Sequence, residues 1–252
     1  MEQLTKKKKS IFTLLTIFIP VLFFLLLELF LRLISYAGNT DLIVAGPEGQ
    51  SQYYTINPNA AARYFSTFEI NLQTAYDVFL KQKPANGYRI FVLGGSTAAG
   101  YPYGNNLMFS RILNQRLNEA FPELTVEVIN TAAPAINSYT QLDFMNEIID
   151  YEPDAILIYS GHNEFYGALG VASVESLGRA RWFVNLYLKL QRFKIFLFMR
   201  NVISGVRSVF QSDIDRTSGT LMERLVEDQQ IPFGSRIYED GKKQFFQYFE
   251  KT

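Results

Sequence analysis

Three short apolar runs in the middle of the chain are each followed by small or polar residues. The runs at 90–93, 125–129 and 155–159 are rich in Ile, Val and Leu, which is typical of strands covered on both faces of a parallel sheet. Between them, apolar positions recur at helical spacing over 109–121 and 139–151, which predicts two amphipathic helices. Strands that alternate with helices form right-handed βαβ units, so we predict an α/β fold with helices on both faces of the sheet.

The longest apolar stretch lies near the N-terminus. Residues 10–36 carry only two charges, Glu28 and Arg32, and are long enough to cross a bilayer. The preceding segment, residues 1–9, contains four consecutive lysines. The positive-inside rule therefore predicts that this tail lies in the cytoplasm and that the body lies on the other side of the membrane. A cleaved signal peptide is the alternative, but its apolar region would be shorter, and residues 35–38 match a cleavage site poorly. We therefore predict one transmembrane anchor in the lipid bilayer and a periplasmic or extracellular body.

Residues 37–88 form a mixed segment between this anchor and the first predicted strand. Apolar residues at helical spacing predict short lead-in helices over 60–64 and 70–80, the second of which would cover one side of the sheet. Residues 81–87 would then link that helix to the strand. We assign residues 89–252 to the α/β domain.

Residues 179–210 interrupt this domain with apolar side chains that alternate with lysine and arginine. Such a pattern is typical of an amphipathic segment that lies on a membrane surface. Packing of the segment over the domain is an equally open alternative. Residues 240–251 are predicted to form a final helix, and no predicted strand follows it.

The charge of the 252-residue chain is balanced overall but uneven along its length. Four lysines and one glutamate give the first ten residues a net charge of +3, so the remainder carries −3. A mildly acidic body gives no electrostatic argument for nucleic-acid binding. The absence of cysteine excludes disulfides, thiolate metal sites and a cysteine nucleophile. The single histidine is His162, no cluster of metal-ligating residues is visible, and we predict neither a metal nor another cofactor.

The first predicted strand runs into a small-residue turn, Gly94-Gly95-Ser96, with a serine at its tip. A phosphate loop of the GxxxxGK[ST] type is excluded because no lysine follows Gly100, and the glycine spacing does not fit the dinucleotide fingerprint G-x-G-x-x-G. Open α/β sheets bind ligands at the carboxyl ends of their strands. Ser96 would stand there, near the start of the next helix, where free backbone N–H groups favour negative charge. A nucleophilic serine and an ordinary glycine-rich turn are the two interpretations that remain.

The residues after the three strands form a pattern that resembles the SGNH/GDSL hydrolase family. Residues 94–96 correspond to that family's Gly-Asp-Ser block, and residues 130–138 correspond to its Asn-rich loop, with Ala135 where glycine is usual. Residues 161–164, Gly-His-Asn-Glu, correspond to its Gly-x-Asn-Asp block and are especially similar to membrane-anchored bacterial members. The resemblance covers the chain from about residue 60 to its end, and it rests on the order and spacing of three short blocks.

The resemblance implies a three-layer, flavodoxin-like parallel sheet of about five strands, of which we recognise three. It also implies ester hydrolysis by a nucleophilic serine, which needs a base because its hydroxyl is a weak nucleophile at neutral pH. Family members use a histidine near the C-terminus and an aspartate three residues before it, and this chain contains no such Asp-x-x-His pair. His162 occupies the variable position of its block and is expected to shape the pocket rather than to act as the base. We therefore expect this chain to be the N-terminal part of a longer protein, with the fold incomplete at the C-terminus.

The residues of the three blocks receive separate roles by this resemblance. Ser96 is the expected nucleophile, and its own N–H, the backbone N–H of Ala135 and the side chain of Asn163 are expected to stabilise the oxyanion. Alanine can supply the same N–H as glycine where its backbone angles permit. A loop-capping amide is the alternative role for Asn163. The expected pocket residues are Gly95, Gly161, His162 and Glu164.

These features together predict a membrane-anchored serine ester hydrolase that acts outside the cytoplasm on an acyl ester of an envelope carbohydrate or lipid. One alternative is an O-acyltransferase that acts on envelope polysaccharide, which would use the same residues and differ only in the acceptor. Another is a non-catalytic scaffold or binding protein that kept the fold. Because the chain lacks the expected base, these 252 residues alone are predicted to be inactive. The sequence identifies neither the ester substrate nor the oligomeric state.

Overall fold

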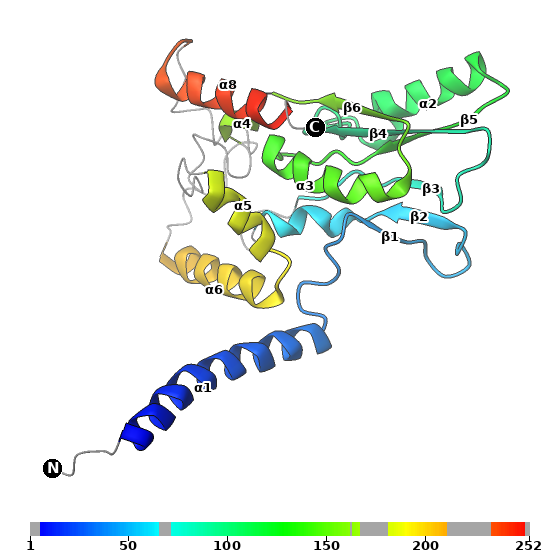
Figure 1. Cartoon of the computed structure of the whole chain (residues 1–252). Coiled ribbons are helices and arrows are strands. Elements are labelled where there is room, and N and C mark those ends of the chain that lie inside the picture. Colours follow the sequence, from blue (N-terminus) through cyan, green and yellow to red (C-terminus); the bar gives the residue numbers. More distant parts are fainter. Residues whose placement is uncertain (1–5, 66–71, 162, 167–180, 211–232, 250–252) are drawn as a thin grey trace.

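The structure, a computed structural model, places a long N-terminal helix beside an α/β body (Figure 1). Helix α1 (Lys6–Leu33) extends away from the body, and the chain enters the body through the short strand β1 (Ile43–Ala45). The residues that the structure describes are 6–65, 72–161, 163–166, 181–210 and 233–249.

The body is organised around a three-stranded parallel sheet, as the sequence predicts. The strand order is β5-β4-β6, so the strand that precedes Ser96 lies in the middle. Gly94 of β4 pairs with Tyr159 of β6, and the register is parallel on both sides of β4. All three strands therefore end at the same edge of the sheet. They are β4 (Gly87–Gly94), β5 (Thr125–Asn130) and β6 (Ala155–Tyr159).

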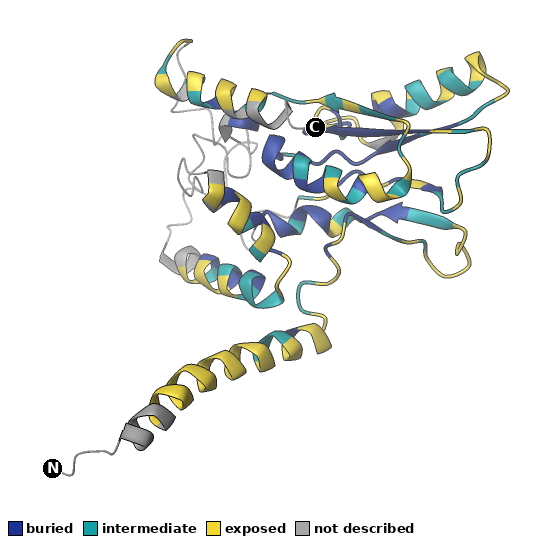
Figure 2. Cartoon of the chain, viewed as in Figure 1, coloured by how far each residue is buried: buried dark blue, intermediate teal, exposed yellow. Residues whose placement is uncertain are grey.

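Side chains of β4 alternate between two apolar cores on opposite faces of the sheet. Ile90 and Val92 share one core with helix α2 (Phe109–Ala120). Phe91 belongs to the larger core on the other face, which helix α3 (Ser138–Ile148) covers. Figure 2 shows that most of the central strand β4 and the inner side of α3 are buried, whereas the edge strand β6 is partly exposed. Helices thus lie on both faces of the sheet, which confirms the predicted α/β class without identifying the fold further.

Residues 37–88 contain an antiparallel sheet that the sequence pattern did not predict. It has three strands in the order β1-β2-β3. The predicted helix over 60–64 corresponds to the 3-10 helix η1 (Pro58–Arg63). The remaining two strands are β2 (Tyr53–Ile56) and β3 (Val78–Leu80).

The predicted lead-in helix over 70–80 is wrong, because β3 occupies its last residues. In β3 only Phe79 is fully buried, between exposed Val78 and half-buried Leu80, so burial follows the period of a strand. The Phe79 ring packs edge-on against the ring of Phe91 in β4, with 5.5 Å between centroids. Pairing with β2 supplies the backbone hydrogen bonds, and this tertiary context outweighs the local helical spacing.

A buried arginine joins the two sheets. Arg89 of β4 is 1% exposed, and its guanidinium donates to the Glu127 carboxylate on β5 at 2.9 and 3.0 Å. The same guanidinium donates to the carbonyl oxygens of Leu80 at 2.7 Å and of Tyr151 at 2.8 Å. A buried charge needs a partner and full hydrogen bonding. Arg89 has both, and it ties β3 and the short helix η3 (Ile149–Tyr151) to the parallel sheet.

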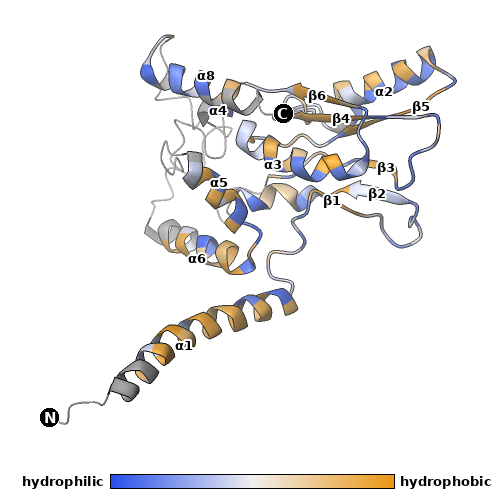
Figure 3. Ribbon diagram, in the orientation of Figure 1, coloured by the Kyte–Doolittle hydropathy of each residue, from blue (hydrophilic) through white to orange (hydrophobic). Residues whose placement is uncertain are grey.

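Helix α1 is long and apolar enough to cross a membrane over Phe12–Leu33, as the sequence predicts for the anchor. Only 6% of its most apolar window is buried in the protein, which is unlike a core helix of a soluble domain. Figure 3 shows apolar residues along most of its length. Residues 1–5 of the predicted cytoplasmic tail lie outside the described part of the chain.

The predicted amphipathic segment forms two helices within its described part, residues 181–210. They are α5 (Arg181–Leu190) and α6 (Lys194–Phe210). Helix α5 packs against α3, and α6 packs against α1, so the segment covers part of the body and contacts the long N-terminal helix. The predicted final helix is α8 (Arg236–Phe249), which packs on α3 and on the short helix α4 (Asn163–Tyr166).

Candidate functional site

The loops that follow β4, β5 and β6 are joined by hydrogen bonds at one edge of the sheet. The N–H of Ala133 donates to the carbonyl oxygen of Gly94 at 3.2 Å, so the loop after β5 runs alongside the end of β4. The amide of Gln141 on α3 donates to the Ser160 hydroxyl at 2.8 Å, which ties the loop after β6 to the same edge. The three sequence blocks lie on these three loops.

Ser96 lies half-buried in a single hydrogen-bonded turn directly after β4. The N–H of Ala99 donates to Gly95 O at 3.0 Å, and the N–H of Tyr101 donates to Ser96 O at 2.9 Å. The N–H and the hydroxyl of Ser96 make no hydrogen bond to any residue that the structure describes. Within this part of the chain, both groups are therefore available to a ligand.

The prediction that Ser96 lies near the start of the next helix is wrong. Helix α2 begins only at Phe109, and a turn with the short helix η2 (Asn105–Leu107) intervenes. Gly100 and Gly104 have φ values of 89° and 75°, which glycine adopts readily and other residues resist. The chain therefore reverses direction before the helix begins, and the free N–H of Ser96 belongs to the turn.

Gly94 allows the Ser96 turn to fold back over the end of β6. A Cβ atom at Gly94 would lie 2.5 Å from both the Cβ of Ala98 and the carbonyl oxygen of Tyr159. Any side chain at this position would push the turn and β6 apart. Gly95, one of the predicted pocket residues, is itself buried in the turn.

Ala135 adopts a backbone conformation that favours glycine, the residue usual at this position in the resembled family. Its φ is +59°, in the left-handed region, where a residue with a Cβ costs about 1–2 kcal/mol. Its N–H has no hydrogen-bond acceptor within the part of the chain that the structure describes. The backbone angles thus permit the substitution of alanine for glycine, and the N–H remains available.

Asn163 is the first residue of α4 and is 3% exposed. Its side-chain Nδ2 donates to the carbonyl oxygen of Ile136 at 2.9 Å, so the amide bridges the loops after β5 and β6. The loop-capping role is thus present in the structure. An amide nitrogen carries two hydrogens, and the second has no acceptor in the described residues.

Glu164 lies beneath the site rather than in an open pocket wall. It is 1% exposed, and its two carboxylate oxygens accept from the Ser138 N–H at 2.8 Å and the Ser138 hydroxyl at 2.7 Å. Ser138 is the first residue of α3, so the carboxylate also faces the positive end of that helix. Glu164 therefore fixes the loop that carries Ala135 against the block that carries Asn163.

Of the other two residues of the third block, Gly161 is described by the structure and His162 is not. Gly161 is half-buried with a φ of 152°, a conformation that favours glycine. His162 lies outside the described residues, so its place in the pocket stays a prediction.

Asn130 and Asp77 hold the site together, although the sequence analysis gave them no role. The buried Asn130 amide donates to Ala98 O at 2.7 Å in the Ser96 turn and accepts from the Ala132 N–H at 2.9 Å. Asp77 in turn accepts from the Asn130 N–H at 2.9 Å and from Arg111. Burial raises the pKa of the Asp77 carboxyl, and the hydrogen bond from Asn130 partly opposes this shift. The sequence feature that could have identified this role is Asn130 itself, a polar residue at the end of an apolar strand.

An apolar cleft of about 590 Å³ opens beside the Ser96 turn. The cleft is lined by Thr97 and Gly100 of the turn, by Phe109 of α2 and by Tyr159 of β6. The rings of Phe109 and Tyr159 pack edge-on at 6.3 Å. Apolar clefts with a few polar groups at their margin suit small organic ligands. The described members of the predicted pocket do not line this cleft: Gly95 is buried within the Ser96 turn, and Gly161 and Glu164 lie at the loop after β6.

No known family model, curated protein or solved structure matches this chain. The likeness to SGNH hydrolases therefore rests on the residues and geometry described above.

Proposed function

We propose that this chain carries the nucleophile and the oxyanion hole of a membrane-anchored serine ester hydrolase of the SGNH type. The observation that carries the proposal is a pair of backbone N–H groups, at Ser96 and Ala135. Neither has an acceptor in the described residues, and they lie on adjoining loops at the carboxyl edge of the sheet. Preorganised N–H groups at such an edge stabilise negative charge that develops in a transition state.

The proposed chemistry begins at the Ser96 hydroxyl. Its oxygen attacks the carbonyl carbon of an ester, the hydroxyl proton passes to a base, and the carbonyl oxygen becomes an oxyanion. The N–H groups of Ser96 and Ala135 and the second N–H of Asn163 would donate to that oxyanion. Collapse of the intermediate expels the alcohol, and water then releases the acid from the acyl-serine.

The apolar cleft beside the Ser96 turn supports an acyl ester as the substrate class. Its aromatic walls, Phe109 and Tyr159, would hold the acyl group while Ser96 reacts at the margin. An esterified envelope carbohydrate or lipid fits a body that α1 holds near a membrane. We propose that the body faces the outside of the cytoplasm, following the lysines at the N-terminus.

The proton acceptor is the part of the mechanism that these residues do not supply. The resemblance implies an Asp-x-x-His pair, and the sequence given contains none. Transfer of the acyl group to a sugar would use the same nucleophile and oxyanion donors, so hydrolysis and transfer differ only in the acceptor. A product assay with a sugar acceptor separates these two.

The test is covalent labelling of the protein expressed in membranes from its complete reading frame. A fluorophosphonate probe should label the protein on Ser96, and Ser96→Ala should abolish labelling. Ser51→Ala is the matched control, because it removes an exposed hydroxyl from the turn between β1 and β2, outside the cleft, and is expected to leave labelling intact. Equal labelling of the Ser96→Ala variant, or none while a known serine esterase labels in the same membranes, would refute the proposal.

A further inference from the structure

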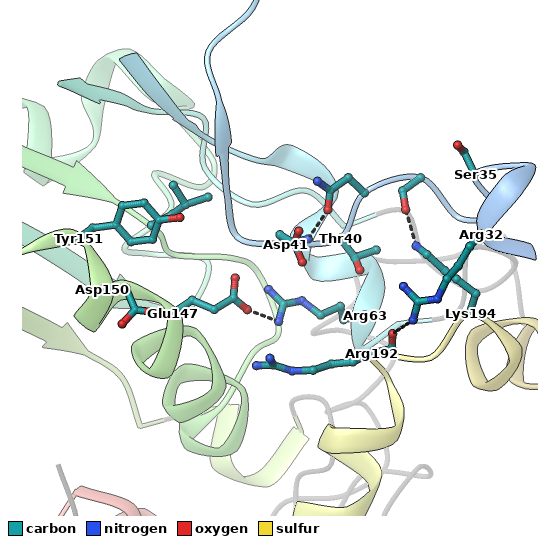
Figure 4. Close-up of a pocket in the computed structure, with 13 residues that line it drawn as sticks. Arg32, Ser35, Thr40, Asp41, Arg63, Glu147, Asp150, Tyr151, Arg192 and Lys194 are labelled. Atoms are coloured by element: carbon teal, nitrogen blue, oxygen red, sulfur yellow. Dashed lines mark hydrogen bonds and ion pairs between the residues drawn. The ribbon is translucent and has the colours of Figure 1, made fainter. Parts of the chain in front are cut away.

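A second cavity, of about 570 Å³, lies where the end of α1 meets the body (Figure 4). Its walls come from the last turn of α1, from η1, from the end of α3 and from the link between α5 and α6. None of the candidate catalytic residues lines it. The cavity is therefore separate from the proposed ester site.

Two cations, Arg32 and Lys194, line the side of this cavity that the end of α1 and the start of α6 form, whereas the Arg192 guanidinium reaches across to Asp143 of α3 at 3.6 Å. The side chains of Arg32 and Arg192 are more than half exposed, at 52% and 57%. Lys194 donates to the carbonyl oxygen of Gly38. Burial and the nearby charge of Arg32 both lower the pKa of Lys194, so these two cations repel each other on the same side of the cavity. An anion between them would relieve that repulsion.

A further arginine forms the floor between the two sides. Arg63 is 3% exposed, and its Nη1 donates to the carboxylates of Asp143, at 3.1 Å, and Glu147. Its Nε and Nη2 atoms are buried without a partner in the residues that the structure describes. Unsatisfied buried donors of this kind are rare in proteins and point to a missing ligand or water.

The carboxylates of Glu147 and Asp150 line the opposite side of the cavity, and Asp41 lies between the two sides. Asp41 and Asp150 form no ion pair within the described part of the chain. Figure 4 places Arg32 and Lys194 on one side of the cavity and Asp150 on the other, with Arg63 between them. The cavity is thus polarised, positive toward α1 and negative toward the end of α3.

The position of the cavity selects one class of ligand. The apolar span of α1, Phe12–Leu33, ends at its positive side, so in a bilayer the cavity lies at the depth of the lipid headgroups. In a zwitterionic phospholipid the phosphate lies next to the hydrocarbon and the ammonium lies farther out. The order of charges in the cavity is complementary to that arrangement.

We propose that this cavity binds a phosphoethanolamine headgroup, with its phosphate against Arg32 and Lys194 and its ammonium against Asp41 and Asp150. A primary ammonium offers three N–H donors to carboxylates, which a quaternary ammonium lacks. The proposal requires α1 to lie in a bilayer, and it does not depend on the chemistry of Ser96. Lipid held here fixes the body against the membrane surface.

The test is a titration of the full chain in detergent with short-chain lipids, measured by the shift of its thermal midpoint. Phosphatidylethanolamine should bind more tightly than phosphatidylglycerol, phosphatidylcholine and inorganic phosphate. Lys194→Gln should weaken phosphatidylethanolamine binding roughly tenfold through the loss of a charged hydrogen bond. Asp150→Asn should reduce the preference for phosphatidylethanolamine over phosphatidylglycerol. The matched control is Lys189→Gln, because Lys189 is exposed on α5 outside the cavity. This variant should change neither the affinity for phosphatidylethanolamine nor the preference for it over phosphatidylglycerol.

The remaining outcomes overturn the proposal in distinguishable ways. Equal binding of inorganic phosphate makes the cavity a simple phosphate site. Equal binding of phosphatidylglycerol or phosphatidylcholine removes the role of the ammonium. Release of the chain from membranes by alkaline extraction would show that α1 does not span the bilayer, and the proposal requires that it does. Lipid binding that Ser96→Ala leaves intact supports a site independent of the ester chemistry, and its loss in that variant contradicts it.

Discussion

At the residue scale, the candidate site depends on backbone N–H groups that single residues make available. Ser96 has a free N–H because glycine at Gly94 lets the turn close over the sheet edge. Ala135 has one because its backbone lies in the left-handed region. Glu164 is buried and supports the site indirectly, because its carboxylate accepts hydrogen bonds from Ser138 at the start of α3. The chemistry that we propose therefore rests on loop geometry more than on charged side chains.

Replacement of Ala135 by glycine is predicted to be tolerated or mildly stabilising. Relief of the left-handed cost, about 1–2 kcal/mol, is partly offset by the greater freedom of glycine in the unfolded chain, about 0.4–1 kcal/mol. We expect the free energy of unfolding, measured by urea denaturation in detergent, to rise by up to about 1 kcal/mol. Ala133→Gly is the matched control, because Ala133 is buried in the same loop with an ordinary φ, and it should lose about 1 kcal/mol. Equal losses in both variants would contradict the assigned conformation of Ala135.

Asp154 is predicted to make stability depend on pH in the acid range. The hydrogen bond from Lys83 and a second from the Arg89 N–H lower the pKa of its carboxyl below the ordinary value of 3.8. A lowered pKa in the folded state stabilises the protein above pH 3.8, and this contribution is lost as the pH falls through the folded-state pKa. Asp154→Asn should therefore flatten the fall of the urea midpoint below pH 4. Glu48→Gln, in an exposed turn, should not change the slope, and an unchanged slope in Asp154→Asn would refute the linkage.

At the scale of elements, the site depends on how two sheets are held together. The parallel sheet supplies the edge with the three loops, and the antiparallel sheet contributes Phe79 to the core beneath it. Arg89 connects them through Glu127, Leu80 and Tyr151. The site edge and the Arg89 cluster lie at opposite ends of β4, so the cluster acts on the stability of the scaffold and not on the chemistry.

Arg89→Ala is predicted to be among the most destabilising single changes in the body. It removes the cation that pairs with Glu127, whose carboxylate keeps only the hydrogen bond from the Leu80 N–H, and it leaves two carbonyl oxygens without the Arg89 donor, which costs about 3–5 kcal/mol for a buried ion pair. Arg116→Ala removes an exposed ion pair with Glu119 and should cost less than about 1 kcal/mol. Urea denaturation followed by far-UV circular dichroism compares the two. Similar small losses would show that Arg89 does not join the sheets.

At the scale of the whole molecule, the apolar helix and the body are coupled by a short contact. Glu28 of α1 accepts hydrogen bonds from the N–H groups of Lys194, at 3.1 Å, and Ile195, at 2.8 Å, and thereby caps α6. The ring of Tyr36 packs edge-on against Phe198 at 5.6 Å just beyond the helix. The charge of Glu28, within the apolar span of α1, is thus satisfied by backbone N–H groups at the start of α6.

Glu28→Ala is predicted to loosen the start of α6. Loss of a helix cap costs about 1–2 kcal/mol, so amide hydrogen exchange in the first turn of α6 should accelerate by roughly tenfold. Thr16→Ala changes a polar residue of α1 that bonds only within the helix, to Phe12 O, and should leave α6 unaffected. Unchanged exchange in Glu28→Ala would mean that the contact does not hold anchor and body together.

The sequence predicted the parts of the molecule that local pattern determines. The runs at 90–93, 125–129 and 155–159 form the parallel sheet as predicted, but only the central run is covered on both faces, and Leu157 and Tyr159 of the edge strand β6 are exposed. The strand at Val78–Leu80 was missed because its conformation depends on pairing with β2. The contact between Asp77 and Asn130 was missed because it joins residues 53 positions apart, and no local pattern encodes it. The roles of Ser96, Ala135 and Asn163 follow from the resemblance and stay predictions.

The most direct test of the account is the structure of the protein after reaction with a fluorophosphonate. The proposal predicts phosphorus bonded to Ser96 Oγ, with a phosphoryl oxygen about 2.7–3.1 Å from the backbone nitrogens of Ser96 and Ala135. The amide nitrogen of Asn163 should lie within reach of the same oxygen. An adduct on another residue, or a phosphoryl oxygen directed away from the Ala135 nitrogen, would contradict the proposed nucleophile and oxyanion hole.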